Sequence, residues 1–348
     1  MKLAFVINDI ATEQDNYSTI RLTRRCVEMG IDVSLVSQSE LSYMPGGALC
    51  APASRPSTTG YADDTEILAD LQEPENRRHV VTLNEVDVLM LRADPAKEIV
   101  ERPWAHPSGL LFAQLIADSG VIVVNDPRRL TDASNKTYFQ QYPEAIRPRT
   151  CITRDAQTIR AFIEDQDGRA VIKPLQGSGG EGVFVITDGG RSNLNQMIEA
   201  TVRFGYAIVQ EYLPAAADGD LRLITLNGRP LQVDGTYACF RRYNETEDAR
   251  SNITAGGAIE MAEPDEDAIN VAEIASPKLV RDGMYLAGLD IVGATMMEIN
   301  VDTPGGIGQA EDLTGIDFSG AVLRDLRHKV RLQELYGGRF ANREIAMM

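Results

Sequence analysis

The sequence lacks the residue patterns on which several common kinds of site depend. Its four cysteines stand far apart with no C-x-x-C pair, and its three histidines are equally scattered, so no zinc site is indicated. No apolar run reaches about 18 residues, the length that a membrane-spanning helix needs. Residues 1–9 form a short apolar run that polar residues end, which predicts a first β-strand and not a signal peptide. We therefore expect a reduced, soluble, cytoplasmic protein.

Positive charge is also scarce. The 348 residues include 34 Lys and Arg against 51 Asp and Glu, a net charge of −17 at pH 7. Such a chain is poorly suited to nucleic acid or an anionic membrane, so we expect neither as a partner. A negatively charged ligand such as ATP would need local cations or metal ions. The length and an apolar content of 43% are typical of a globular protein with two or three compact units.

Residues 1–124 predict an α/β unit with a parallel sheet, because strand-like and helix-like segments alternate. The expected strands are 3–7, 32–36, 86–91 and 121–124, the expected helices are 19–29 and 108–118, and 44–64 is expected to form a hairpin or long loop. Arg92 and Asp94 directly follow the strand 86–91. Open α/β sheets bind ligands at the carboxyl ends of their strands, so both are candidate ligand contacts. A solvated loop is the alternative.

Residues 125–205 predict a smaller unit. Thr131-Asp132 is a helix-start signal, so a helix is expected to begin at Asn135-Lys136. The strand 170–174 carries Lys173, and the run 177–182 spells G-x-G-x-x-G before a second strand, 183–186. A dinucleotide fingerprint needs a helix after the glycines, and a kinase loop has its lysine after them. The remaining interpretation is a hairpin whose backbone N–H groups approach phosphates, with a purely structural hairpin as the alternative.

Residues 206–338 predict the largest unit, followed by a tail, 339–348, that carries no signal. It should contain a strand at 207–209, an antiparallel pair with its turn at Asn227-Gly228, and helices at 265–282 and 318–335. The polar segment 241–257 has few apolar residues. Its composition is that of a mobile lid, although an ordinary surface loop is the default interpretation.

The segment 288–301 predicts two short strands joined at Gly293-Ala294. Glu298 and Asn300 are two residues apart, so they leave the same strand face, and Asp290 can converge on that face from the other strand. Three oxygen ligands on a hairpin suit Mg²⁺, which takes few protein ligands and completes its shell with phosphate oxygens. Three polar residues on a solvated face are the alternative.

These pieces together resemble the bacterial glutathione synthetases, members of the ATP-grasp superfamily of carboxylate–amine ligases. The similar blocks occur in family order across about residues 80–310: Asn125-Asp126-Pro127, Asn135-Lys136, 171–175, the glycine loop, 210–214, 219–222, 250–257, Gly288-Leu289-Asp290 and 298–301. The resemblance implies an ATP-grasp fold with a Rossmann-like N-terminal domain (1–124), a small lid subdomain (125–205) and a larger α+β subdomain (206–338). It also implies ATP, two Mg²⁺ ions with Mn²⁺ as an alternative, and a homo-tetramer or dimer.

The resemblance further implies a role for each matching position. The nucleotide would contact Lys136, Lys173, Gly177, Ser178, Gly179, Gly180, Gln210, Glu211, Tyr212, Leu213, Asp220 and Arg222. The metal ligands would be Asp290, Glu298 and Asn300. Catalytic groups near the acyl phosphate and the acceptor would be Arg242, Arg250 and Asn252, and the substrates would meet Tyr17, Arg92, Asp94 and Thr303.

The sequence departs from the family at the substrate end. A family Arg-x-Asp-Pro-Pro-Phe-Asp segment reads Arg92-Ala93-Asp94-Pro95-Ala96-Lys97-Glu98, and a Lys-Asp-Ser or Lys-Asp-Thr segment reads Tyr17-Ser18-Thr19. The leading hypothesis is a ligase that joins γ-glutamylcysteine to glycine. The alternatives are a ligase for a different small peptide, thiol or natural product, a phosphotransferase that stops at the phosphorylated product, and a non-catalytic nucleotide-binding subunit.

Overall fold

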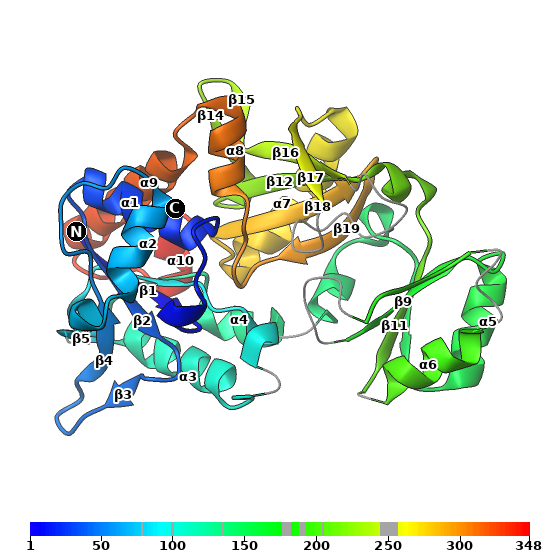
Figure 1. Ribbon diagram of the computed structural model, residues 1–348, viewed down its shortest axis with the longest axis horizontal. Coiled ribbons are helices and arrows are strands. Elements are labelled where there is room, and N and C mark those ends of the chain that lie inside the picture. The colour runs from blue at the N-terminus through cyan, green and yellow to red at the C-terminus, as the bar shows by residue number, and fades with distance from the viewer. Residues whose placement is uncertain are drawn as a thin grey trace.

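The computed structural model describes residues 1–77, 79–98, 101–133, 136–175, 182–187, 193–203, 205–243 and 257–348. Its described strands form a seven-stranded, a six-stranded and a four-stranded sheet, together with a small two-stranded ribbon. In Figure 1 the seven-stranded N-terminal sheet lies at the left, the six-stranded central sheet in the upper middle, and the four-stranded sheet at the right. No helix in the described ranges has the length and apolar character needed to cross a lipid bilayer.

The N-terminal sheet is mixed: one half is parallel, as the alternating pattern predicts, and the segment 42–82 adds antiparallel strands to it. Its strands are β1 (Lys2–Ile7), β2 (Asp32–Ser37), β3 (Ser42–Tyr43), β4 (Leu49–Ser54), β5 (His79–Thr82), β6 (Val88–Leu91) and β7 (Ile122–Val124). The order is β3-β4-β2-β1-β6-β7, with β5 paired to β4, and β2, β1, β6 and β7 run parallel. The carboxyl ends of β1 and β6 therefore meet at one edge, which brings together the loops that follow them.

Helices from both ends of the chain cover this sheet (Figure 1). They are α1 (Ser18–Glu28), α2 (Asp64–Gln72), α3 (Ala105–Asp118), α4 (Pro127–Ala133), α9 (Phe318–Leu335) and α10 (Asn342–Ala346). One apolar core joins Phe5 of β1 to Phe318 of α9 and Ile345 of α10. The tail 339–348, for which the sequence gives no signal, thus packs on the N-terminal sheet. The division of the chain into units at 124, 205 and 338 stays a prediction.

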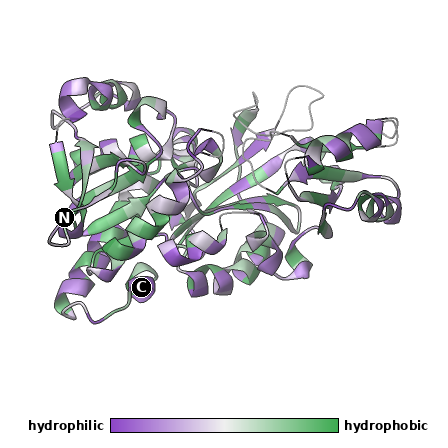
Figure 2. Ribbon diagram, turned by 90° about the horizontal axis from the view of Figure 1, so that it is seen from below, coloured by the Kyte–Doolittle hydropathy of each residue, from purple (hydrophilic) through white to green (hydrophobic). Residues whose placement is uncertain are grey.

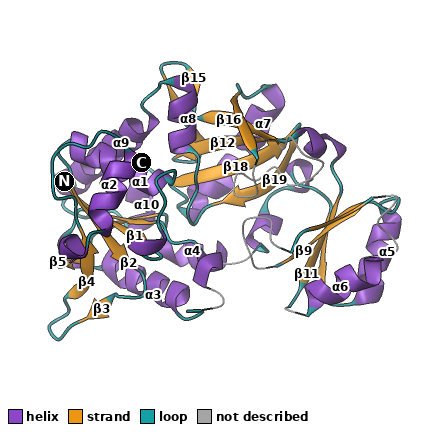
Figure 3. Cartoon of the chain, in the orientation of Figure 1, coloured by secondary structure: helices purple, strands orange, loops and turns teal. Residues whose placement is uncertain are grey.

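The four-stranded sheet is antiparallel and has its own core. It contains β8 (Thr150–Thr153), β9 (Ala170–Pro174), β10 (Phe184–Ile186) and β11 (Ala207–Glu211), in the order β10-β9-β11-β8. Helices α5 (Ala156–Asp165) and α6 (Leu194–Val202) cover the face turned away from the central sheet (Figure 3). The predicted hairpin around the glycine run is confirmed in its strands, because Phe184 pairs with Ile172 in antiparallel register.

The central sheet is antiparallel and carries the hairpin with Asp290. Its strands are β12 (Asp220–Leu226), β13 (Arg229–Pro230), β16 (Cys239–Tyr243), β17 (Ala258–Met261), β18 (Leu286–Val292) and β19 (Thr295–Asn300), with α7 (Glu266–Asp282), α8 (Ile307–Thr314) and the ribbon β14 (Gln232–Val233) and β15 (Thr236–Tyr237) beside it. The predicted turn at Asn227-Gly228 is confirmed, with φ angles of 53° and 74° that suit a type I′ hairpin. Figure 2 shows green, hydrophobic stretches and purple, hydrophilic ones alternating within the sheets and helices of the molecule.

The helix predicted to begin at Asn135-Lys136 is wrong for the part that the structure describes. Helix α4 already contains residues 131–132, and Lys136 lies in a turn after it. The cause is a stronger start signal upstream. The Asp126 Oδ1 atom accepts hydrogen bonds from the backbone N–H groups of Arg128 and Arg129 at 3.1 and 3.2 Å. Pro127, which has no N–H group, occupies the first helical position.

Candidate active site

A cavity of about 490 Å³ is lined by strand residues of the four-stranded and central sheets and by the segments that follow β1 and β6 of the N-terminal sheet. Every predicted site residue that the structure describes lines it: Tyr17, Arg92, Asp94, Lys136, Lys173, Gln210, Glu211, Tyr212, Leu213, Asp220, Arg222, Arg242, Asp290, Glu298, Asn300 and Thr303. The remaining predicted positions, Gly177, Ser178, Gly179, Gly180, Arg250 and Asn252, lie outside the described residues. Residues more than 280 positions apart in the chain thus share one cavity.

Charged side chains of both signs lie on neighbouring strands of the central sheet at this cavity. The strand register sets Arg222 opposite Asp290, and Asp290 opposite Glu298. In the neighbouring pair of strands Arg242 lies opposite Asp220. The predicted convergence of Asp290 with Glu298 is therefore confirmed as geometry, since opposite residues in an antiparallel pair share a face.

The carboxylate of Asp290 is buried and bound by two arginines. Arg222 Nη2 lies 3.0 Å and Arg242 Nη2 lies 2.9 Å from its Oδ2 atom, and Asn300 donates to the same oxygen at 3.3 Å. Burial by itself would raise the pKa of Asp290, but Arg222 and then Arg242 hold it below its ordinary value. Asp290 is consequently ionised while only 3% exposed.

Arg242 corrects the sequence-based interpretation of the segment 241–257. That segment was predicted as a mobile lid, but Arg242 lies within strand β16 and is only 8% exposed. Its Nε atom donates to Asp220 at 3.0 Å, and Asp290 and Asp220 raise its pKa against the opposing effect of burial. The polar composition of the segment does not indicate the two acidic partners of Arg242, Asp220 and Asp290, because they lie 22 and 48 positions away in the chain. Residues 244–256 lie outside the described ranges.

Two lysines face the carboxylates from the other side of the cavity. Lys173 on β9 and Lys136, in the turn after α4, both line it together with Glu298. Burial lowers the pKa of Lys173 to about 8; Glu298 opposes this shift and Lys136 adds to it. The side chain of Glu298 has no hydrogen bond or ion pair with any other described residue, although its backbone belongs to the β18–β19 ladder. Two cations and a carboxylate are therefore gathered where a polyanion and a metal ion could bind.

The segment from Gln210 to Leu213 forms one edge of the cavity. Gln210 is buried at the end of β11 and donates to Thr150 at 3.3 Å. Tyr212 and Leu213 continue past the strand with their backbone outside the ladder. This edge offers peptide groups beside the apolar side chains of Val171 and Val185, which is a suitable surface for a planar heterocycle.

The opposite end of the cavity is built from the loops after β1 and β6. Arg92 is 3% exposed, donates to Thr19 at 3.2 Å and to the carbonyl oxygen of Pro304 at 2.9 Å, and lines the cavity. The Lys97 ammonium donates to the Tyr17 hydroxyl at 3.0 Å. The side chain of Asp94 accepts the backbone N–H of Ala96 at 2.9 Å.

Sequence reasoning missed Glu13, which also lines this end. It follows β1 on the same sheet edge as Arg92 and is 6% exposed. Burial raises the pKa of its carboxyl to about 7, although Lys97 and then Arg92 act in the opposite direction. Its position after a parallel strand was an available signal, the same one that singled out Arg92.

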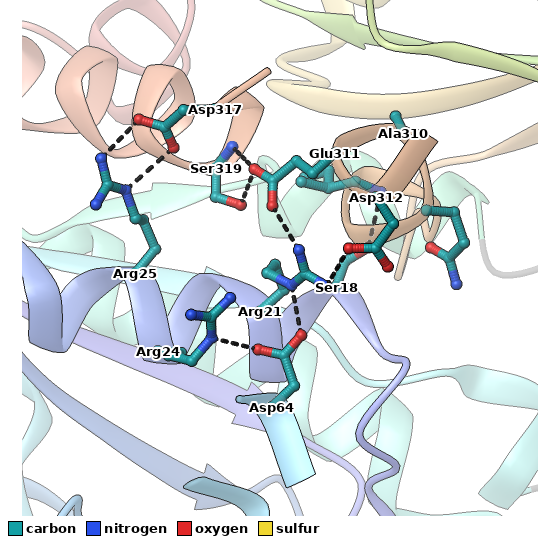
Figure 4. Close-up of polar contacts among 12 residues, drawn as sticks. Ser18, Arg21, Arg24, Arg25, Asp64, Ala310, Glu311, Asp312, Asp317 and Ser319 are labelled. Atoms are coloured by element: carbon teal, nitrogen blue, oxygen red, sulfur yellow. Dashed lines mark hydrogen bonds and ion pairs between the residues drawn. The ribbon is translucent and has the colours of Figure 1, made fainter. Parts of the chain in front are cut away.

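A charged network holds the two helices whose N-termini meet at this end (Figure 4). Arg21 of α1 lies 3.0 Å from Glu311 and 2.8 Å from Asp312 of α8. The hydroxyl of Ser18 accepts the backbone N–H groups of Gly306 and Ile307 at 3.1 and 3.2 Å. Because Ser18 follows Tyr17 directly, the network fixes the substrate end of the cavity to the segment that follows β19.

The oxygen donors of the hairpin fit a hard divalent cation. The described residues contain no cluster of three or more His, Cys, Asp or Glu, so a site built wholly from such ligands is not found among them. Asp290, Glu298 and Asn300 instead supply two carboxylates and one amide. Mg²⁺ binds beside phosphates with a small set of oxygen ligands of this kind. To bind Asp290, the ion would have to replace part of the contact that Arg222 and Arg242 make with its carboxylate.

Known structures define the class of this fold. The chain is similar to D-cycloserine synthetase DcsG, with 14% identity and a TM-score of 0.60 over 94% of this chain and 100% of that one. It is also similar to a RimK domain ATP-grasp protein from Sphaerobacter thermophilus, with 16% identity and a TM-score of 0.57 over 93% and 98%. The fold is therefore that of an ATP-grasp protein, and the predicted fold class is confirmed.

Sequence comparison identifies the family. The profile described as prokaryotic glutathione synthetase, N-terminal domain, matches residues 1–131, and the one described as prokaryotic glutathione synthetase, ATP-grasp domain, matches residues 135–315. Similar proteins named glutathione synthetase come from Thermosynechococcus vestitus (36% identity over 243 residues, 69% of this chain and 72% of that protein) and a Synechocystis species (29% over 331 residues, 93% and 98%). The chain belongs to the prokaryotic glutathione synthetase family. It is an ATP-dependent carboxylate–amine ligase that uses a divalent metal ion and small-molecule substrates.

Proposed function

We propose that the chain joins the cysteinyl carboxylate of γ-glutamylcysteine to the amine of glycine. The observation that carries this proposal is the gathering of the described predicted positions around one cavity, with lysines and paired carboxylates at one end and Arg92 at the other. The length of the match also supports it, because the Synechocystis protein named glutathione synthetase aligns over 93% of this chain.

The family resemblance supplies the proposed residue roles, and the charges at the two ends of the cavity support them. Lys136 and Lys173 bind the α- and β-phosphates with the glycine loop 177–180, and the backbone of 210–213 binds adenine. Asp290, Glu298 and Asn300 hold two Mg²⁺ ions, for which Mn²⁺ can substitute, beside Asp220 and Arg222. Tyr17, Arg92, Asp94 and Thr303 contact the substrates. The Glu298 carboxylate, which has no partner among the described residues, lies near Lys173 and supports this arrangement.

The chemistry requires no protein nucleophile. ATP supplies the phosphoryl group, and the metal ions neutralise charge that develops on the phosphates. An oxygen of the donor carboxylate attacks the γ-phosphorus and ADP leaves. The acceptor amine then attacks the activated carbonyl carbon, inorganic phosphate leaves, and the nitrogen loses a proton. Arg242, Arg250 and Asn252 stabilise the tetrahedral oxyanion that forms when the amine attacks, before inorganic phosphate leaves.

The departures at the substrate end favour one alternative, a ligase for a different small peptide, thiol or natural product. Lys97 and Tyr17 bond to each other where the family has other residues, which changes the shape offered to a substrate. We further propose a homo-oligomer, a tetramer or a dimer, by analogy with the family. The four free cysteines support a reducing, cytoplasmic location.

The test is an ATP-dependent condensation scored by mass spectrometry. The purified protein is incubated with ATP, MgCl₂, γ-glutamylcysteine and glycine, then with panels of other carboxylate donors and amines. We expect the tripeptide together with an equimolar amount of ADP. A condensed product from another pair, with none from γ-glutamylcysteine and glycine, would establish the alternative. Omitting the amine is the control, since release of ADP that continues unchanged without an acceptor would indicate a phosphotransferase.

A further inference from the structure

Glu13 is a buried acid that the charge network of the cavity leaves uncompensated. It lies in the loop between β1 and α1, lines the cavity, and is 6% exposed. Its Oε2 atom is buried without a hydrogen-bond partner among the described residues. Burying an unpaired carboxylate is costly, so a protein that keeps one at a cavity wall has a ligand as the natural partner for it.

Arg92 faces the same end of the cavity with the opposite charge. Its Nε and Nη2 atoms are bonded, but Nη1 is buried without a partner among the described residues. Glu13 and Arg92 influence each other electrostatically, yet no ion pair joins their charged atoms in the described part of the chain. Lys97, the other cation near Glu13, is bonded to Tyr17. The Glu13 carboxylate and the Arg92 guanidinium thus line the same cavity without pairing. Each has one buried polar atom without a hydrogen-bond partner among the described residues.

We propose that Glu13 is a specificity-determining residue that binds the ammonium group of the carboxylate donor. Arg92, on the other side, is positioned for an anionic group of the same donor. The donor would therefore be a peptide that presents a free amino group at the end remote from its reacting carboxylate. This inference rests on the proposed function, because it assigns the substrate end to the donor, but it concerns a residue to which the family resemblance gives no role.

A purely structural role for Glu13 does not account for a buried carboxylate without a hydrogen-bond partner among the described residues. A structural acid at the position of Glu13 would pair with Arg92 or Lys97. Glu98, which follows β6, is an acid of this kind, because it pairs with Arg102 at 2.9 Å. Asp15, two positions further along, is exposed and accepts the Thr65 hydroxyl at 2.8 Å. Glu13 differs from both, because it is buried, unpaired and at the cavity wall.

The test is direct binding of two donors that differ only in the amino group. γ-Glutamylcysteine carries it, and glutarylcysteine lacks it while keeping both carboxylates. Their affinities for the full-length protein are measured by calorimetry in the presence of ADP and MgCl₂. We expect the wild-type protein to bind γ-glutamylcysteine roughly 10- to 100-fold more tightly, as for a hydrogen bond between charged groups, and Glu13→Gln to bind the two alike.

Asp15→Asn is the matched control, since it removes an acid of the same loop that does not line the cavity. It should keep the wild-type discrimination, and both variants should bind ADP as the wild type does. Equal binding of the two peptides by the wild type, binding of neither, or discrimination that survives in Glu13→Gln would overturn the inference. The condensation assay separates this result from the proposed function: tripeptide formed by a protein that ignores the amino group contradicts the role of Glu13 alone.

Discussion

Asp290 and Glu13 are buried carboxylates of one cavity in opposite electrostatic surroundings. Asp290 is bound by Arg222 and Arg242, which hold its pKa below the ordinary value, whereas burial raises the pKa of Glu13 to about 7. The first stands on a strand of the central sheet, and the second stands on a loop of the N-terminal sheet. Asp290 is thus compensated within the protein, while Glu13 is left without a charged partner among the described residues.

The two kinds of surroundings predict different responses to substitution at the two ends of the cavity. Asp290 has arginine partners on other strands, so altering one of them leaves a buried charge without part of its compensation. Loop residues such as Glu13 and Lys97 make few contacts with the sheet ladders, and they can vary with little effect on the nucleotide end. Each of the following predictions tests one side of this comparison, from the largest expected effect to the smallest.

Arg242→Ala should lower the free energy of unfolding by about 3–5 kcal/mol, the range for removing one partner of a buried ion pair. The substitution removes the guanidinium that binds buried Asp220 and leaves Asp290 with Arg222 and Asn300. Urea unfolding followed by circular dichroism measures this. Arg241→Ala is the control, because Arg241 is the neighbouring arginine with an exposed ion pair to Glu260 and should contribute about 0–1 kcal/mol. Equal losses in both variants would remove the distinction between a buried and an exposed arginine.

Glu298→Gln should reduce turnover roughly 10²-fold or more, by analogy with deleting one electrostatic stabiliser, and should leave the folded structure intact. Its carboxylate has no partner among the described residues, so its removal breaks no ion pair there. Steady-state ADP release at several Mg²⁺ concentrations is the measurement, and the loss should be smaller at high Mg²⁺. Glu260→Gln removes an exposed carboxylate of the same sheet and should behave as wild type. Near-normal turnover in Glu298→Gln would exclude Glu298 as a metal ligand.

The sequence predicted the parts of the molecule that local signals specify. Helix α7 was expected at 265–282 and is found after the Asp265 N-cap, ending at Gly283 with a φ of 70°. The convergence of Asp290 and Glu298 followed from alternation along two strands. The surroundings of Arg242 could not be predicted, because its partners Asp220 and Asp290 reach it only through the order of strands in the sheet. Glu13 was missed although it follows a parallel strand, because local sequence does not distinguish a buried acid from a solvated one in a short loop.

Glu13→Gln should stabilise the ligand-free protein in a pH-dependent way. Because folding raises the pKa of this carboxyl from 4.5 to about 7, the folded chain holds the proton more tightly than the unfolded chain does. Stability is therefore lost as pH rises from about 4.5 to about 7, by roughly 3 kcal/mol at about 1.4 kcal/mol per pKa unit. The variant should be more stable than wild type by up to that amount at pH 8 and equal to it near pH 4.5. Urea unfolding at both pH values checks this, and a pH-independent difference would mean that Glu13 is compensated after all. Asp15→Asn should show no such pH dependence.

Ser18→Ala should have the smallest effect, and that effect should fall on the substrate end. The Ser18 hydroxyl accepts the N–H groups of Gly306 and Ile307, so it caps the N-terminus of α8 from another helix. Loss of such a cap costs about 1 kcal/mol. Because Arg21 still binds Glu311, α8 should remain docked while its first turn loosens beside Tyr17. The KM for the donor should then rise a few-fold with the KM for ATP unchanged, and thermal unfolding should shift only slightly. Ser42→Ala, an exposed serine of β3, is the control. A rise in the KM for ATP equal to that for the donor would show that the two ends are coupled through α8 and not independently built.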